Sequence, residues 1–146
     1  MQPLSRGHGR SPSSIAEIGY AANPRGLGVA YVRTEFQGQN AVLRVPFRVQ
    51  SGLGLFDRQV GYAALAAVVK KLEDKGMGRI VIRLDDDSLI EDVQGHREVP
   101  AALSLSYIRL GCALNALAEY RLETGADNAQ DLTARARAEV HLAAAA

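Results

Sequence analysis

The first third of the chain alternates apolar and polar positions with the short period of β-strands. Three segments rich in β-branched and aromatic side chains are expected to be strands: residues 14–20, 27–36 and 40–49. Asn23-Pro24 marks a turn between the first two, and Gln37-Gly38-Gln39 joins the last two into a β-hairpin. Pro46 lies inside the third strand and has no backbone N–H. We therefore expect that strand at a sheet edge or at a bulge.

The period then changes to that of helices. Apolar residues recur every three to four positions over residues 57–75, which predicts a helix with Asp57 as its N-cap and Gly76 after its end. The remaining elements are a strand at 79–84, helices at 88–94 and 101–119, a strand at 120–124 and a helix at 128–146. Three consecutive strands followed by alternating elements predict an α/β fold, with a mixed five-stranded sheet flanked by helices.

The composition fits one globular domain, with 47% hydrophobic and 23% charged residues among 146. Residues 1–13 mix Gly, Ser, Pro and Arg without an apolar period, so we expect a flexible N-terminal tail before a domain at residues 14–146. No apolar run approaches the ~20 residues of a membrane span, and the N-terminus lacks the apolar core of a signal peptide. We expect a cytoplasmic protein without membrane contact.

The formal net charge is +1, which argues against a strongly basic binder of polyanions. The charge is unevenly distributed, since residues 1–50 hold six arginines and two glutamates, whereas residues 51–146 hold 11 basic and 14 acidic side chains. A single cysteine, Cys112, excludes an intramolecular disulfide and a multi-cysteine zinc site. Cys112 shares an apolar helix face with Leu105 and Ile108, so we expect it in the core.

Four local patterns, in this order of elements, resemble the type 1 bacterial ribonuclease H domains. They are Glu17 six residues before Asn23-Pro24, the run Gly61-Tyr62-Ala63-Ala64-Leu65, the strand that ends in Asp85-Asp86-Asp87 and is followed by Leu89-Ile90, and the run Asp127-Asn128-Ala129-Gln130-Asp131-Leu132. The resemblance spans roughly residues 14–140. It implies the ribonuclease H-like fold, in which three antiparallel strands precede parallel ones.

The resemblance also implies a metal site. Such nucleases are expected to hold two Mg²⁺ (or Mn²⁺) ions about 4 Å apart between converging carboxylates. It assigns Glu17, Asp85 and Asp131 as catalytic residues, and the same three with Asp86 as metal ligands. Which of Asp85, Asp86 and Asp87 takes the family position stays open, as does the choice between Gln130 and Asp131. The triple aspartate could also be a solvated turn whose last member caps the next helix.

The chain departs from the family pattern at two of these positions. Gly61 replaces the helix glutamate and offers no ligand, and Glu17 is one methylene longer than the family aspartate. Asp57, one helical turn before Gly61, could lean into the site. We therefore expect a degenerate site and a weakly active or inactive domain. The alternative is an active Mg²⁺-dependent endoribonuclease that cleaves the RNA strand of RNA/DNA hybrids.

Candidate nucleic-acid contacts are Asn23, Arg25, Arg33 and Arg44. The resemblance places the Asn-Pro turn against a nucleic-acid strand, and the hairpin arginines could face phosphates. The alternative interpretation is structural, since Asn and Pro form turns and charged residues protect sheet edges from aggregation. The partner is then an RNA/DNA hybrid or structured RNA, while a protein partner or a second copy of the chain is the competing expectation.

Overall fold

The computed structural model describes residues 14–50 and 55–145 of the chain. The predicted tail at residues 1–13 lies outside the described residues. Five strands form one sheet in the order β3-β2-β1-β4-β5. Their bounds are β1 (Ser14–Ala22), β2 (Leu27–Phe36), β3 (Gln39–Arg48), β4 (Arg79–Leu84) and β5 (Glu119–Thr124). The first three strands pair antiparallel and β1-β4-β5 pair parallel, so the predicted mixed sheet is confirmed.

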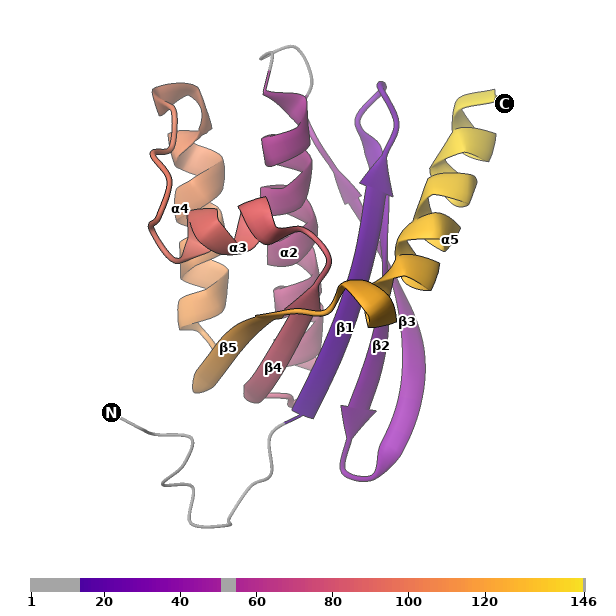
Figure 1. Ribbon diagram of the computed structural model, residues 1–146, viewed down its shortest axis with the longest axis vertical. Coiled ribbons are helices and arrows are strands. Elements are labelled where there is room, and N and C mark those ends of the chain that lie inside the picture. The colour runs from indigo at the N-terminus through magenta and orange to yellow at the C-terminus, as the bar shows by residue number, and fades with distance from the viewer. Residues whose placement is uncertain (1–13, 51–54, 146) are drawn as a thin grey trace.

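Helices cover both faces of this sheet (Figure 1). Their bounds are α2 (Phe56–Asp74), α3 (Asp87–Val93), the 3₁₀ turn η1 (Ala101–Leu103), α4 (Ser104–Asn115) and α5 (Ala126–Ala145). Alternate β1 residues such as Ala16 and Ile18 are fully buried in the main core under α2 and α4. A smaller core forms on the other face, where α5 packs its Leu132 and Ala136 against Val29 of β2.

Glycine allows α5 to approach the sheet closely. A Cβ atom at Gly19 of β1 would lie 2.2 Å from the Thr133 backbone nitrogen and 2.5 Å from the Leu132 carbonyl carbon. The backbones of β1 and α5 therefore meet at a point where no larger residue fits. This contact fixes the position of α5 relative to the carboxyl end of β1.

Two predicted helix caps were wrong. Leu55, not Asp57, precedes α2, and no side chain caps that helix; Asp57 lies inside its first turn. The cap of α3 is Asp86 rather than Asp87, because the Asp86 carboxylate accepts a hydrogen bond from the Leu89 amide. The strand β4 ends at Leu84, and the backbone of Asp86 is still extended, which is the conformation typical of an N-cap residue.

The expected burial of Cys112 was also wrong. Cys112 is exposed, and so are Leu105 (59%) and Ile108 (58%) on the same helix. Apolar residues lie on more than one side of α4, and the side that packs inward carries Leu110 and Leu114. The predicted helix 101–119 also breaks into η1 and a shorter α4.

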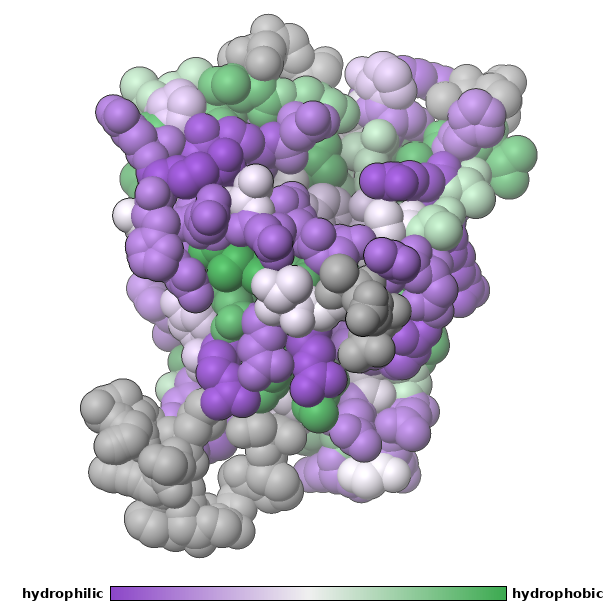
Figure 2. Space-filling model, viewed as in Figure 1, coloured by the Kyte–Doolittle hydropathy of each residue, from purple (hydrophilic) through white to green (hydrophobic). Residues whose placement is uncertain are grey.

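The surface seen in Figure 2 carries mainly hydrophilic side chains with smaller apolar areas between them. Within the described residues, no helix has both the length and the apolar character needed to cross a membrane.

Candidate functional site

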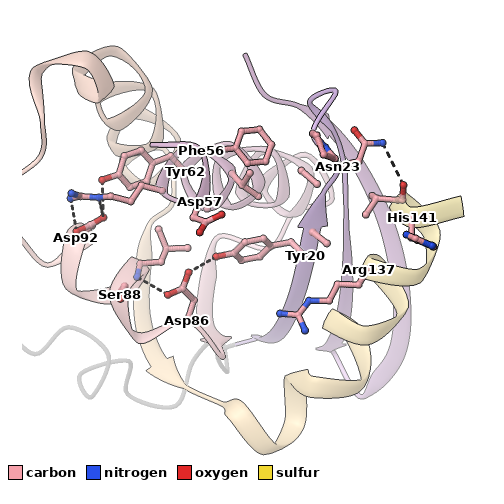
Figure 3. A pocket seen from close by; sticks show the side chains of 18 of the residues that line it. Tyr20, Asn23, Phe56, Asp57, Tyr62, Asp86, Ser88, Asp92, Arg137 and His141 are labelled. Atoms are coloured by element: carbon pink, nitrogen blue, oxygen red, sulfur yellow. Dashed lines mark hydrogen bonds and ion pairs between the residues drawn. The ribbon is translucent and has the colours of Figure 1, made fainter. Parts of the chain in front are cut away.

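A cavity of about 700 Å³ opens at the carboxyl ends of β1 and β4 (Figure 3). The end of β1 and the turn after it form its floor, and the first turns of α2 and α3 and the second half of α5 form its walls. Open α/β sheets bind ligands at the carboxyl ends of their strands, outside the sheet. This cavity is therefore the candidate site.

The centre of the cavity holds a tyrosine–carboxylate pair. The Tyr20 hydroxyl donates to Asp86 Oδ2 at 2.8 Å, while Asp86 Oδ1 accepts from the Leu89 amide at 3.2 Å. Burial, and then the negative charge of Asp86, raise the pKa of Tyr20 above its ordinary range. Tyr20 is therefore a neutral donor, and its bond ties the end of β1 to the start of α3.

Gly61 lies directly across from Tyr20 on α2. A Cβ atom at Gly61 would stand 3.1 Å from the Tyr20 hydroxyl and 3.4 Å from the Leu89 methyl carbons. The space in front of Gly61 is therefore filled by the phenol of Tyr20. Asp57, one turn earlier on α2, is exposed and lines the same cavity, where Figure 3 shows its carboxylate near the Tyr20 hydroxyl.

Glu17 lies on the opposite face of β1 from Tyr20. In the sheet register it stands between Arg33 of β2 and Arg83 of β4. Its carboxylate lies 3.1 Å from Arg33 Nη1 and 3.8 Å from Arg83 Nη1, and its side chain is only 11% exposed. Two guanidinium groups thus satisfy the carboxylate, which explains how a charge is tolerated on a central strand.

Asp85 and Asp131 also lie on the α5 side of the sheet. Asp85 Oδ2 accepts a hydrogen bond from the Thr133 hydroxyl at 2.9 Å, whereas the neighbouring Asp86 turns to the cavity. Asp131 is exposed and forms an ion pair with Arg33. Consecutive residues after a strand point to opposite sides, so Asp85 and Asp86 separate.

The four predicted metal ligands therefore do not share one site: Asp86 turns to the cavity, whereas Glu17, Asp85 and Asp131 lie on the α5 side of the sheet. The residues that the structure describes contain no group of three or more His, Cys, Asp or Glu side chains that could hold a metal ion. A two-metal centre needs several carboxylates around one point. Here Gly61 supplies no ligand, Asp86 accepts from a phenol, and Glu17 is held by arginines. These residues do not fit the metal pair that the family resemblance implies.

The predicted nucleic-acid contacts have structural partners in three of four cases. The Asn23 side chain is buried: its oxygen accepts from the amides of Arg25 and Leu27, and its nitrogen donates to the Val140 carbonyl at 3.4 Å. Arg33 bridges Glu17 and Asp131 as described above. Arg44 is paired with Glu139. Arg25 is exposed.

A buried carboxylate beside the cavity was not predicted. Asp92 of α3 is 1% exposed and accepts hydrogen bonds from Arg58, Arg97 and Tyr62 at 2.7–3.1 Å. Burial alone would raise the pKa of Asp92, but these hydrogen bonds outweigh it and lower the pKa below its ordinary value. No local pattern marks Asp92, because its partners come from other segments.

Three further cavity residues were missed, and for these the sequence does carry a signal. Tyr20 lies three residues after Glu17, and an odd spacing on a strand places two residues on opposite faces. Arg137 and His141 lie four residues apart on α5, which places both on one side of a helix.

Comparisons with known proteins find structures of similar fold. No family model and no curated protein matches the chain. Ribonuclease H1 from the halophilic archaeon Halobacterium salinarum NRC-1 matches with a TM-score of 0.65 at 14% identity, over 88% of this chain and 99% of that one. The N-terminal RNase H domain of a Mycobacterium tuberculosis protein, solved as a fusion with maltose binding protein, matches with a TM-score of 0.67 at 13% identity, over 92% and 99%.

A third structure is LC11-RNase H1 in complex with an RNA/DNA hybrid. It matches with a TM-score of 0.58 at 13% identity, over 87% of this chain and 98% of that one. At such identities a structural likeness establishes architecture and leaves chemistry to the site itself. The chain has the ribonuclease H-like fold that these structures share.

Proposed function

We propose that this chain is a nucleic-acid-associated ribonuclease H-like domain with an incomplete acidic site that does not support hydrolysis. The observation that carries the proposal is the bond from the Tyr20 hydroxyl to Asp86, made in front of Gly61. A neutral phenol occupies the middle of the candidate site, where a metal-dependent nuclease would need ionised oxygen ligands.

The electrostatics of the two sheet faces support the same conclusion. Glu17 is neutralised by Arg33 and Arg83 on the α5 side, so it brings no net negative charge to the cavity. Asp57 and Asp86 are the acidic side chains of the cavity wall apart from Asp92, which is already paired with two arginines. Two carboxylates from adjacent helix starts are fewer than the convergent set a metal pair requires.

The proposed association with nucleic acid rests on the fold and on the cations at one edge of it. A structural neighbour was solved with an RNA/DNA hybrid bound. In this chain Arg25 is exposed at the turn after β1, and Arg137 lines the cavity from α5. With a net charge of +1 we expect moderate affinity that falls as salt is added, because phosphate contacts release counterions.

A cleavage assay tests the catalytic half of the proposal. Labelled RNA/DNA hybrid is incubated with the chain and Mg²⁺ or Mn²⁺, in parallel with the Asp86→Asn variant. We expect the two proteins to show the same background level of hybrid cleavage. Metal-dependent cleavage by the unmodified chain, lost in Asp86→Asn, would overturn the proposal.

A binding assay tests the other half. Fluorescence anisotropy of the same hybrid is followed at rising salt concentration. We expect binding at low salt that weakens as salt is added, and a hybrid that stays free at low salt would contradict nucleic-acid association.

The alternative is an active hybrid-cleaving endoribonuclease, and one observation favours it. Asp57 and Asp86 line the same cavity as Gly61, so two carboxylates do face one space. In that case Asp57→Asn should reduce metal-dependent cleavage, whereas Asp74→Asn, an exposed aspartate at the other end of α2, should leave it unchanged.

A further inference from the structure

We infer that the cavity at the carboxyl ends of β1 and β4 binds a single unpaired nucleotide whose base carries an amino group. Arg137 takes the phosphate, and Asp57 takes the amino group of the base. The inference rests on the proposed nucleic-acid association and names the unit that this site recognises.

The phosphate side of the cavity is formed by α5. Arg137 and His141 are one helical turn apart, both line the cavity, and both are exposed. Neither has an ion-pair or hydrogen-bond partner among residues 14–50 and 55–145. Figure 3 shows the Arg137 side chain reaching from α5 toward Tyr20. A guanidinium offers two parallel N–H donors that match a phosphate.

Among the arginines that line the cavity, Arg58 and Arg97 are paired with Asp92, whereas Arg137 forms no ion pair within the described residues. Seven arginines form ion pairs within the described residues: Arg33, Arg44, Arg58, Arg79, Arg83, Arg97 and Arg121. Arg137 lies on a cavity wall and has no such carboxylate. A bound anion would supply the negative counter-charge that the described residues do not give to Arg137.

The base side of the cavity is formed by the first turns of α2 and α3. The Asp57 carboxylate has no hydrogen-bond partner in the described part of the chain and lines the cavity. The phenyl ring of the preceding Phe56 is half-buried in the same wall. A carboxylate accepts hydrogen bonds from the exocyclic amino group of adenine, cytosine or guanine. A neighbouring aromatic ring offers a surface on which a base stacks.

The size of the cavity and the separation of its charges select the ligand. At about 700 Å³ it falls in the range of small-molecule sites. An acidic wall, a basic wall and an aromatic side chain together match a molecule with an amino group, an anionic group and a flat ring. Both faces of a paired base inside a duplex are covered by stacking, so a base that stacks on Phe56 must come from an unpaired nucleotide.

The test is a titration of the full chain followed by amide chemical shifts in two-dimensional NMR. The probes are AMP, CMP, UMP and adenosine. We expect AMP and CMP to shift amides around Asp57 and Arg137, with binding of UMP and of adenosine weaker by about tenfold. Adenosine lacks the phosphate, and uracil has no exocyclic amino group, so that only its ring N3–H could donate to Asp57.

Matched variants separate the two contacts. Asp57→Asn should abolish the preference for AMP over UMP, with Asp74→Asn as the control on the same helix. Arg137→Gln should abolish the preference for AMP over adenosine, with the exposed Arg109→Gln on α4 as the control. All four positions are exposed, so folding is retained and the spectrum of each variant verifies it.

Two sources of the ligand are distinguished by a fifth probe, a short single-stranded oligoadenylate. Tighter binding than AMP through the same residues assigns the site to a strand end, and equal binding assigns it to free nucleotides.

The inference is overturned if no probe shifts the cavity amides, or if Asp57→Asn and Arg137→Gln behave like their controls. If the chain binds the hybrid but no mononucleotide, only this inference fails. If the chain cleaves the hybrid and also binds AMP, only the proposed lack of activity is wrong.

Discussion

The Tyr20 hydroxyl and Asp86 Oδ2 lie 2.8 Å apart, although 66 positions separate the two residues in the chain. Asp86 also caps α3 through the Leu89 amide, so one carboxylate fixes the end of β1 and the start of α3. The bond depends on the missing side chain at Gly61, whose place the phenol fills. Tyr20 on β1 and Gly61 on α2 are therefore complementary in size.

The first prediction concerns this complementarity. Gly61→Glu should destabilise the fold by about 2 kcal/mol, because the new side chain must displace Tyr20 and leave Asp86 without its donor. Gly61→Ala should be close to neutral, since the tight contact of the methyl group is offset by the gain of roughly 1 kcal/mol in helix propensity. Urea unfolding of the three proteins measures both values.

The control is a double-mutant cycle with Tyr20→Ala. If Tyr20 occupies the space, Gly61→Glu should cost about 1 kcal/mol less in the Tyr20→Ala background than alone. Two substitutions that add within about 0.5 kcal/mol would show that Tyr20 and Gly61 do not compete for that space.

Much of the fold could be predicted because the strands carry strong local patterns. The predicted bounds of β2 and β4, residues 27–36 and 79–84, agree with the structure. The choice of buried face on α4 could not be made, because apolar residues surround that helix and only its packing against α2 decides which of them turn inward. Cys112 was misplaced for this reason.

The site was harder to predict than the fold. Strand alternation separates Glu17 from Tyr20, but only the positions of α2 and α5 tell which face has a cavity and which has the two arginines. Asp85 and Asp86 differ by one residue, and the end of β4 decides which of them turns to the cavity. These orientations depend on contacts between segments that are distant in the chain, and residue spacing carries no information about such contacts.

The second prediction concerns the contact between β1 and α5. Gly19→Ala should destabilise the fold by about 3 kcal/mol, because its methyl group would overlap the backbone at Thr133 and Leu132, which cannot move aside as a side chain could. Gly38→Ala is a comparison within the hairpin, where no atom lies within 4 Å of the new methyl group and the cost comes from its φ of 78° alone. Equal stability of Gly19→Ala and the unmodified chain in thermal unfolding would contradict the close approach.

The third prediction concerns Cys112, the chain's single cysteine. Because its side chain is exposed on α4, the native protein should react with one equivalent of a colorimetric thiol reagent without denaturant. The rate should lie within about tenfold of the rate in urea. A thiol that reacts only after unfolding would place Cys112 back in the core.

The fourth prediction concerns alkaline stability. Burial, and then the hydrogen bond to Asp92, raise the pKa of Tyr62 from 10.0 to about 12. The stability linked to the protonated phenol is fully present below pH 10, the unfolded value, and is lost as the pH rises through about 12. The advantage of the unmodified chain over Tyr62→Phe should therefore shrink by about 2 kcal/mol across that window. A constant difference would contradict the raised pKa, and Tyr20 contributes equally to both proteins.

The fifth prediction concerns the Asp92 network under acid. The carboxylate is 1% exposed and its hydrogen bonds with Arg58 and Arg97 join α2, α3 and the segment after α3. Those bonds hold the pKa of Asp92 below its ordinary value of 3.8, so the stability they provide is present above that value. It is lost as the pH falls through the lower, folded-state pKa.

Asp92→Asn tests this linkage, because the amide keeps the size of the side chain but removes the charge shared by Arg58 and Arg97. We expect a loss of about 3 kcal/mol at neutral pH, and a gap to the unmodified chain that closes as both are titrated below the ordinary aspartate pKa. Asp74→Asn, exposed at the end of α2, should show neither effect. Acid unfolding curves that run parallel for Asp92→Asn and the unmodified chain would show that Asp92 is not the group whose protonation weakens the fold.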